Sequence, residues 1–273
     1  MLCWLKLRSL KLRSLKALPL TLALVTLALV GLTLITTSCT SSNSQVRFVN
    51  AIPDETNVLD IDFNGTKAFG IDPFPSTSGS TYVSVPSGSV TVAGFVSGQT
   101  TNPVFSETSP VSFKSGSQYT VVATGTLAST VILLAPVDTN TAPANGSVNF
   151  RVINASVHGG GSVDVYILPD SAPNTTCTPQ PGTGSSCLPA ITALPSPESS
   201  ISPTSGYVTL PYNSDGFGYT LYVAVAGQPT LVLFGYPFNV GSVSTGSIRT
   251  LVLVDNGNQT GMSQTPLVLN DLN

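Results

Sequence analysis

His158, Gly159, Gly160 and Gly161 form the pattern of an oxyanion loop, in which glycine amides stabilise a tetrahedral reaction intermediate. Such chemistry also needs a serine nucleophile on a Gly-x-Ser-x-Gly turn and a histidine base. The sequence has no Gly-x-Ser-x-Gly, and His158 is its only histidine, so one residue would have to serve two roles. The run therefore predicts a glycine-rich turn, and no catalytic residue is predicted.

Acidic residues suggest a second chemistry. The stretch from Asp60 to Gly65 places side-chain oxygens at alternate positions before a glycine, as the first half of a calcium loop does. Its twelfth position is Ile71 rather than Glu, so a strand followed by a hairpin turn explains the same residues, and no metal site is predicted. A calcium site of another geometry stays open, and it would add the nearby acids Asp54, Glu55 and Asp72.

Two wider sets of residues could act on or bind a polysaccharide. Paired carboxylates for glycoside hydrolysis would have to converge in space, and scattered surface acids are the interpretation adopted. These acids are Asp54, Glu55, Asp72, Glu107 and Glu198. Aromatic rings gathered on one face could stack on a glycan or a protein partner. The aromatic residues concerned are Tyr207, Tyr212, Phe217, Tyr219, Tyr222, Phe234, Tyr236 and Phe238.

The first 38 residues predict how the chain is targeted. Five cations between Lys6 and Lys16 precede an uncharged apolar run from Ala17 to Ile35, which is the order of a signal peptide. Thr36, Thr37, Ser38 and Cys39 follow, and they resemble the lipobox of bacterial lipoproteins, although Thr36 stands where that pattern usually has Leu. The resemblance implies cleavage before Cys39 and a diacylglycerol on its sulfur, which would anchor the chain stably.

Two alternatives to the lipid anchor stay open, namely an uncleaved anchor helix and ordinary secretion. Thr40 follows Cys39, whereas an Asp there resembles an inner-membrane retention signal, so the expected location is the cell envelope, with the outer membrane favoured over the inner. Cleavage would leave five cations against 13 acids, a net charge of about −8. The remaining cations are scattered singly, which argues against a nucleic acid partner.

Export also determines which cysteines remain free to form a disulfide. Cys3 would be lost with the signal and Cys39 would carry lipid, which leaves Cys177 and Cys187 in an oxidising compartment. We expect these two to form a disulfide, because a metal site would need more thiol or imidazole ligands nearby. No cofactor is predicted.

The chain contains an internal repeat. Residues 47–51 (RFVNA) match residues 151–155 (RVINA), and residues 59–63 match residues 163–167 at the same offset. Tyr82 matches Tyr207, but the offset grows by about 21 residues across a stretch rich in Pro, Ser and Thr. We therefore predict a signal peptide at 1–38 and four segments after it. They are a tether at 39–45, repeat 1 at 46–138, a linker at 139–147, and repeat 2 at 148–273 with a Cys-clipped loop insertion at about 171–202.

Both repeats predict β-structure. Short runs rich in Val, Thr, Tyr and Ile alternate with Gly, Pro, Asn and Ser clusters, and Asn64-Gly65 is a strong hairpin signal. Leu59, Ile61 and Phe63 can face a core while the two acids between them face water. The sequence predicts an all-β chain with two tandem antiparallel β-sandwich domains of immunoglobulin-like kind.

Both copies also resemble the bacterial domain of unknown function numbered 4397. The likeness lies in an Arg-containing hydrophobic strand, an Asn-Ala turn and an Asp-bearing strand, within Val46 to Phe63 and Val148 to Ile167. Gly116 to Thr124 resembles a later Gly-Thr-Tyr-Thr-Val stretch. The resemblance implies a repeated envelope domain with no established activity. We expect a lipid-anchored structural or interaction module rather than an enzyme, with an envelope protein or polysaccharide as partner, and a carbohydrate- or polymer-binding accessory protein as the alternative.

Overall fold

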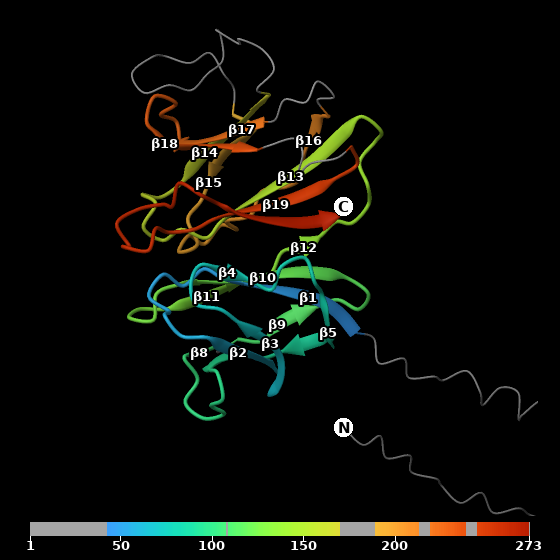
Figure 1. The fold of residues 1–273 in the computed structure, drawn as a ribbon, viewed down its shortest axis with the longest axis vertical. Coiled ribbons are helices and arrows are strands. Elements are labelled where there is room, and N and C mark those ends of the chain that lie inside the picture. Colours follow the sequence, from blue (N-terminus) through green and yellow to red (C-terminus); the bar gives the residue numbers. More distant parts are fainter. Residues whose placement is uncertain (1–42, 108, 170–188, 213–218, 239–244, 273) are drawn as a thin grey trace, which may run out of the picture. The chain divides into compact units, whose positions relative to one another are not determined.

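The computed structural model describes residues 43–107, 109–169, 189–212, 219–238 and 245–272. Within these ranges the protein consists of strands and contains no α-helix, which confirms the all-β prediction (Figure 1). The same ranges accordingly offer no helix of the length and apolar character that a membrane crossing needs. The predicted signal peptide and Cys39, Cys177 and Cys187 lie outside the described residues.

Residues 43–138, the first half, form three sheets. The sheet here named the first inner sheet contains β1 (Asn43–Asn50), β4 (Ser76–Thr77), β5 (Val83–Pro86), β10 (Gln118–Gly125), β11 (Val131–Leu134) and β12 (Val137–Asp138). The first outer sheet contains β2 (Leu59–Phe63), β3 (Thr66–Ile71), β7 (Val92–Val96) and β8 (Phe105–Ser106). A small third sheet pairs β6 (Gly88–Val90) with β9 (Val111–Phe113).

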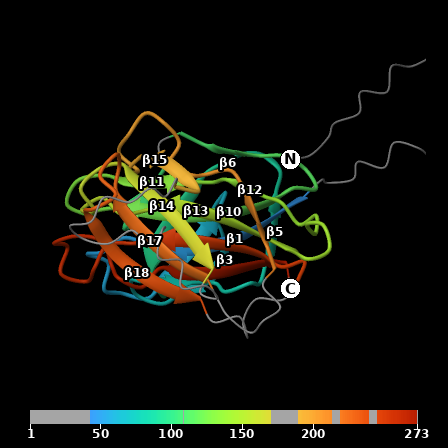
Figure 2. The ribbon, with the colours of Figure 1, turned by 90° about the horizontal axis from the view of Figure 1, so that it is seen from above.

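Residues 147–272, the second half, form two four-stranded sheets. The second inner sheet has the order β16 (Val208–Pro211), β13 (Ser147–Asn154), β19 (Ile248–Leu253) and β20 (Leu267–Leu272). The second outer sheet has the order β15 (Ile191–Leu194), β14 (Val163–Pro169), β17 (Tyr219–Val225) and β18 (Val232–Phe238). Figures 1 and 2 both show β14, β17 and β18 side by side.

The two halves share one strand topology. In each, the first strand pairs in parallel with a late strand, β1 with β10 and β13 with β19. The other strand pairs are antiparallel, as predicted for a sandwich. The predicted hairpin turn at Asn64-Gly65 is confirmed, since it joins β2 to β3, and Leu59, Ile61 and Phe63 are buried as expected.

Three apolar cores separate the four main sheets. The core of the first half includes Phe48 of the inner sheet and Ile61 of the outer sheet, and Phe150 and Val165 play these parts in the second half. A third core joins the two inner sheets face to face. Because side chains alternate between the faces of a strand, each inner strand sends one set of residues into its own half and the other set toward the opposite half.

Two segment boundaries differ from the sequence prediction. The predicted tether extends to residue 45, but β1 already begins at Asn43, and Ser44 is fully buried there. The predicted loop insertion at 171–202 contains β15, because Ile191 and Leu194 are buried in the core of the second half and pair with β14. Small polar residues predict a tether and a loop, but Ser44 is buried on the same face of β1 as Val46, and only Thr192 and Ala193 of β15 are exposed.

Candidate functional site

The densest polar cluster of the described residues lies between the two inner sheets. Arg47 sits in β1 between Val46 and Phe48, which both point into the core of the first half. Alternation therefore turns Arg47 to the opposite face of the sheet, toward the second half. Arg151 takes the corresponding place in β13, between two residues of the second core.

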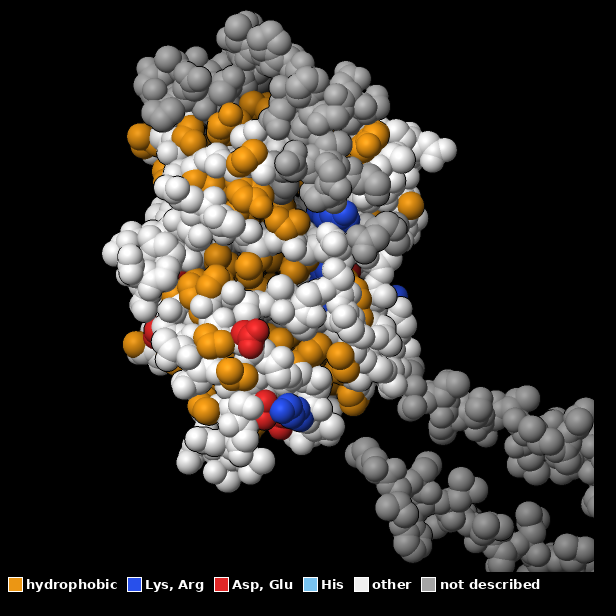
Figure 3. All heavy atoms as spheres, viewed as in Figure 1, with side chains coloured by type: hydrophobic (Ala, Val, Ile, Leu, Met, Phe, Trp, Pro, Cys, Tyr) orange, Lys and Arg blue, Asp and Glu red, His pale blue; other side chains and the backbone are white. Residues whose placement is uncertain are grey.

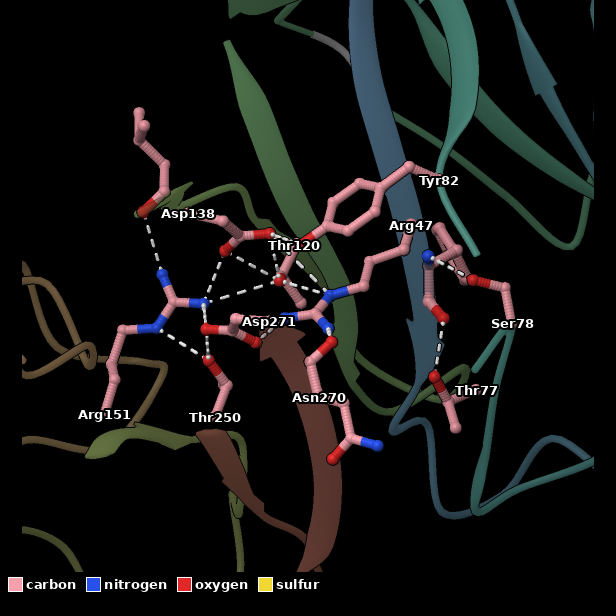
Figure 4. Close-up of polar contacts among 12 residues, drawn as sticks. Arg47, Thr77, Ser78, Tyr82, Thr120, Asp138, Arg151, Thr250, Asn270 and Asp271 are labelled. Atoms are coloured by element: carbon pink, nitrogen blue, oxygen red, sulfur yellow. Dashed lines mark hydrogen bonds and ion pairs between the residues drawn. The ribbon is translucent and has the colours of Figure 1, made fainter. Parts of the chain in front are cut away.

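The two arginines pair crosswise between the halves (Figure 4). Arg47 Nη2 binds a carboxylate oxygen of Asp271, which lies in β20 of the second half. Arg151 Nη2 binds Oδ1 of Asp138, which lies in β12 of the first half, at 2.5 Å. All four side chains are at most 2% exposed. Each half thus supplies one cation and one anion, and the shorter ion pair of each charge is with the other half, beside longer pairs of 3.7 and 3.8 Å within the halves.

Two threonines link the arginines to the aspartates of their own halves. Arg47 Nε donates to Thr120 Oγ1 at 2.9 Å, and Arg151 Nε donates to Thr250 Oγ1 at 3.1 Å. Each threonine hydroxyl then donates to the aspartate of its own half, at 2.8 Å in the first and 2.7 Å in the second. These bonds lie within each half, so they hold the arginine and aspartate side chains in place independently of the other half.

Two tyrosines close the ends of the cluster. The Tyr82 hydroxyl donates to Asp138 Oδ2 at 2.7 Å, and its ring centroid lies 5.1 Å from Arg47 Cζ. In the second half, the Tyr207 hydroxyl donates to Asp271 Oδ2 at 2.6 Å, and the Tyr207 ring centroid lies 4.9 Å from Arg151 Cζ. A guanidinium over an aromatic face gains a cation–π attraction. We call these eight residues the reciprocal cluster: Arg47, Tyr82, Thr120, Asp138, Arg151, Tyr207, Thr250 and Asp271.

The electrostatics favour the charged arginine and the neutral tyrosines. Burial alone lowers the pKa of Arg47, but the carboxylates of Asp271 and Asp138 outweigh it, so the net pKa is raised. Burial raises the pKa of both Tyr82 and Tyr207, and the neighbouring carboxylates raise it further. The tyrosines therefore remain hydrogen-bond donors to the aspartates at any physiological pH.

Backbone carbonyls and apolar contacts complete the junction. Arg47 Nη1 donates to the carbonyl of Asn270, and Arg151 Nη1 donates to that of Val137, both at 2.9 Å. Beside the cluster, the inner sheets bury a common apolar core. Its fully or almost fully buried members are Val49, Ala51, Val122, Ile153, Ala155, Val252, Val254 and Leu269. Because the charges are satisfied and closed to solvent, the cluster can join the halves but cannot reach a substrate.

The glycine-rich run at His158 is a turn, as predicted, with Gly160 and Gly161 at φ values of 85° and 102°. His158 Nδ1 lies 2.9 Å from Oδ2 of the buried Asp255, which also accepts the hydroxyl of Ser156. The serine therefore bonds to the aspartate rather than to the histidine, and the three residues tie two loops together instead of forming a nucleophile and base.

The acids of the proposed calcium loop serve local structure. Asp60 Oδ1 lies 2.7 Å from Lys67 Nζ, and Oδ2 accepts the amide of Gly98 at 3.1 Å, so that these bonds lower the pKa of Asp60. Asp54 accepts the amide of Leu127, which follows β10 at the same end of the sandwich. In the described ranges no three His, Cys, Asp or Glu side chains gather in a way that could hold a metal ion.

The aromatic residues of the second half do not form an exposed face in the described part of the chain. Tyr219 and Phe234 are 6% exposed within the second core, and Tyr207 belongs to the reciprocal cluster. Tyr212 and Tyr236 pack against the second core, and Tyr222 packs against the buried Tyr166. Phe217 and the side chain of Phe238 lie outside what the structure describes.

Comparisons with known proteins find a family match for one part of the chain. Residues 44–166 match the family model described as Domain of unknown function (DUF4397). No curated protein matches the sequence. Among solved structures, the Bacillus anthracis TIE protein is similar with a TM-score of 0.23 and 10% sequence identity. That alignment covers 78% of this chain and 34% of the other, so the chain spans about a third of the length of that protein.

Proposed function

We propose that this protein is a lipid-anchored module of the bacterial cell envelope, in which two copies of the domain of unknown function 4397 are fused into one structural or interaction body. The reciprocal cluster is the observation that carries the proposal. Its charges are at most 2% exposed and pair between the halves. A buried pair of this kind resists separation, since removing one partner leaves an uncompensated charge.

Equivalent positions support two copies of one domain. The second half repeats the parallel pairing of the first, and its Arg151, Thr250 and Asp271 repeat the roles of Arg47, Thr120 and Asp138. The family match covers the first half and continues to residue 166, which lies in the second half. The same physical arrangement in both halves favours the same domain in both.

The predicted anchor and the start of β1 together limit how far the first sandwich could lie from the membrane. The sequence before Cys39 resembles a lipoprotein signal, and β1 begins at Asn43, only four residues after Cys39. Four extended residues span at most about 14 Å. The first sandwich would therefore rest close to the membrane surface, with its inner sheet fixed to the second sandwich. Such a body suits presentation or spacing at the envelope rather than catalysis.

Expression of the full-length chain in a bacterial host tests the proposal, with Cys39→Ala as the variant and Cys3→Ala as the matched control. We expect membrane-fraction protein whose intact mass corresponds to a chain beginning at Cys39 plus lipid, unchanged in Cys3→Ala and lost in Cys39→Ala. A soluble product without lipid, or an uncut chain, would refute the anchor.

A further inference from the structure

The two halves bridge equivalent points of their inner sheets with different segments. In the first half, the Ser78 amide donates to the Phe48 carbonyl and its hydroxyl accepts the Phe48 amide. In the second half, Ser205 makes the same pair of bonds with Val152. The segments leading to these serines are therefore equivalent, although they differ in length and sequence.

The first of these segments fills its side of the junction. It carries Phe74, which packs against the apolar core between the inner sheets. The second segment instead carries Ile201, which is 68% exposed. Pro197 and residues 199–204 of that segment face β11 across an open groove of about 370 Å³. The groove is thus the counterpart of a place that the first half fills with its own aromatic ring.

The groove is continuous with the interface core and carries no charge. Leu134 lines the groove and also packs against the core between the inner sheets. Pro136, Pro197 and Pro203 lie in the lining as well, and none of the lining residues has an ionisable side chain. Figure 3 shows hydrophobic side chains gathered on the visible face at the level where Figure 1 places β11. Ser199, Ser200, Ser202 and Thr204 add uncharged polar groups to the lining, so an uncharged occupant with both apolar and hydrogen-bonding groups fits this surface.

One wall of the groove is the edge of a sheet. In the described structure β11 ends the order of the first inner sheet and pairs with β10 alone. The Pro136 and Thr130 carbonyls accept bonds from the β10 side. Because bonding directions alternate along an antiparallel strand, Leu133 and Ala135, which line the groove, turn their backbone groups away from β10. Free edge groups of this kind bind an added strand.

We propose that this groove receives an extended, uncharged segment of another polypeptide, which pairs with the β11 edge and inserts an aromatic side chain in the place that Phe74 fills in the first half. This deepens the proposed interaction function, because it names the class of partner. It does not depend on the lipid anchor.

The test uses the chain from Ser42 to Asn273, which forms a compact unit by itself. The probe is a capped peptide copying residues 73–79 (PFPSTSG), with the same peptide carrying Phe74→Ser as the matched control. Protein variants are Ile201→Phe, which fills the groove from within, and Ile201→Ser, which does not. Binding is followed by amide chemical shifts in NMR titrations.

We expect the native peptide to shift amides of residues 132–136 and 199–204. The control peptide and the Ile201→Phe protein should each bind at least tenfold more weakly, a loss of about 1.4 kcal/mol, whereas Ile201→Ser should keep binding. Absence of shifts at millimolar peptide would overturn the groove proposal. So would equal affinity of the two peptides for the wild-type protein together with equal affinity of the native peptide for all three proteins. Because the protein used lacks Cys39, neither result bears on the anchor.

Discussion

Replacing Arg47 by Met removes one cation from the reciprocal cluster while keeping most of the side chain's volume. Asp271 then keeps its bonds from Thr250 and Tyr207 and a longer ion pair of 3.8 Å with Arg151, but it loses its nearer guanidinium, and its side chain is 0% exposed. Leaving a buried charge without its partner costs about 3–5 kcal/mol. We expect Arg47→Met to lower the free energy of unfolding by that amount, measured by urea denaturation of Ser42–Asn273 with circular dichroism.

A double-mutant cycle isolates the pair. Arg47→Met combined with Asp271→Asn should cost less than the sum of the single variants by about 0.5–3 kcal/mol, because the second change removes the excess negative charge that the first one leaves. Lys67→Met is the matched control, since Lys67 pairs with Asp60 at 2.7 Å but is 55% exposed. It should cost under about 1 kcal/mol. If Arg47→Met cost no more than Lys67→Met, the assigned role of the reciprocal cluster would be wrong.

Two further predictions concern the same junction. Leu269 is 1% exposed in the core between the inner sheets, so Leu269→Ala should lower the free energy of unfolding by about 2–5 kcal/mol. Unfolding should still give one transition by circular dichroism and tyrosine fluorescence, whereas two separate transitions would show independent halves. Tyr82 and Tyr207 have raised pKa values, so the stability they contribute is present below the ordinary tyrosine pKa of 10.0 and is lost as the pH rises above it. Absorbance titration should therefore show late-ionising tyrosines that Tyr82→Phe reduces in number, and an unchanged titration curve would contradict the assignment.

Local patterns predicted the fold well because they are set by neighbouring residues. Alternation at Leu59, Ile61 and Phe63, followed by Asn64-Gly65, specifies a hairpin whatever else the chain does. The repeat pairing of residues 47–51 with 151–155 likewise anticipated the shared topology. Small polar residues predicted a tether at Asn43 and a loop around Ile191, where the structure has strands. Whether such a segment is buried as a strand depends on sheets formed by distant segments.

The reciprocal cluster was not predicted, although its residues were visible. In the sequence Arg47 and Arg151 are single cations far apart, and Asp271 is distant from both. An arginine at the same place of two otherwise apolar strands was the available signal, since an isolated buried charge is too costly to occur without a partner. Its crosswise pairing follows only from two inner sheets packing face to face, which no local pattern specifies.

Hydrogen exchange of the chain from Ser42 to Asn273 tests most directly whether the two halves form one body. If they do, the slowest amides of β1 and β10 and those of β13 and β19 will exchange with one common free energy, equal to that of global unfolding. Arg47→Met should then lower this value equally in both halves. If one half opened at a clearly lower free energy while the other stayed protected, the halves would be independent domains and the account would be contradicted.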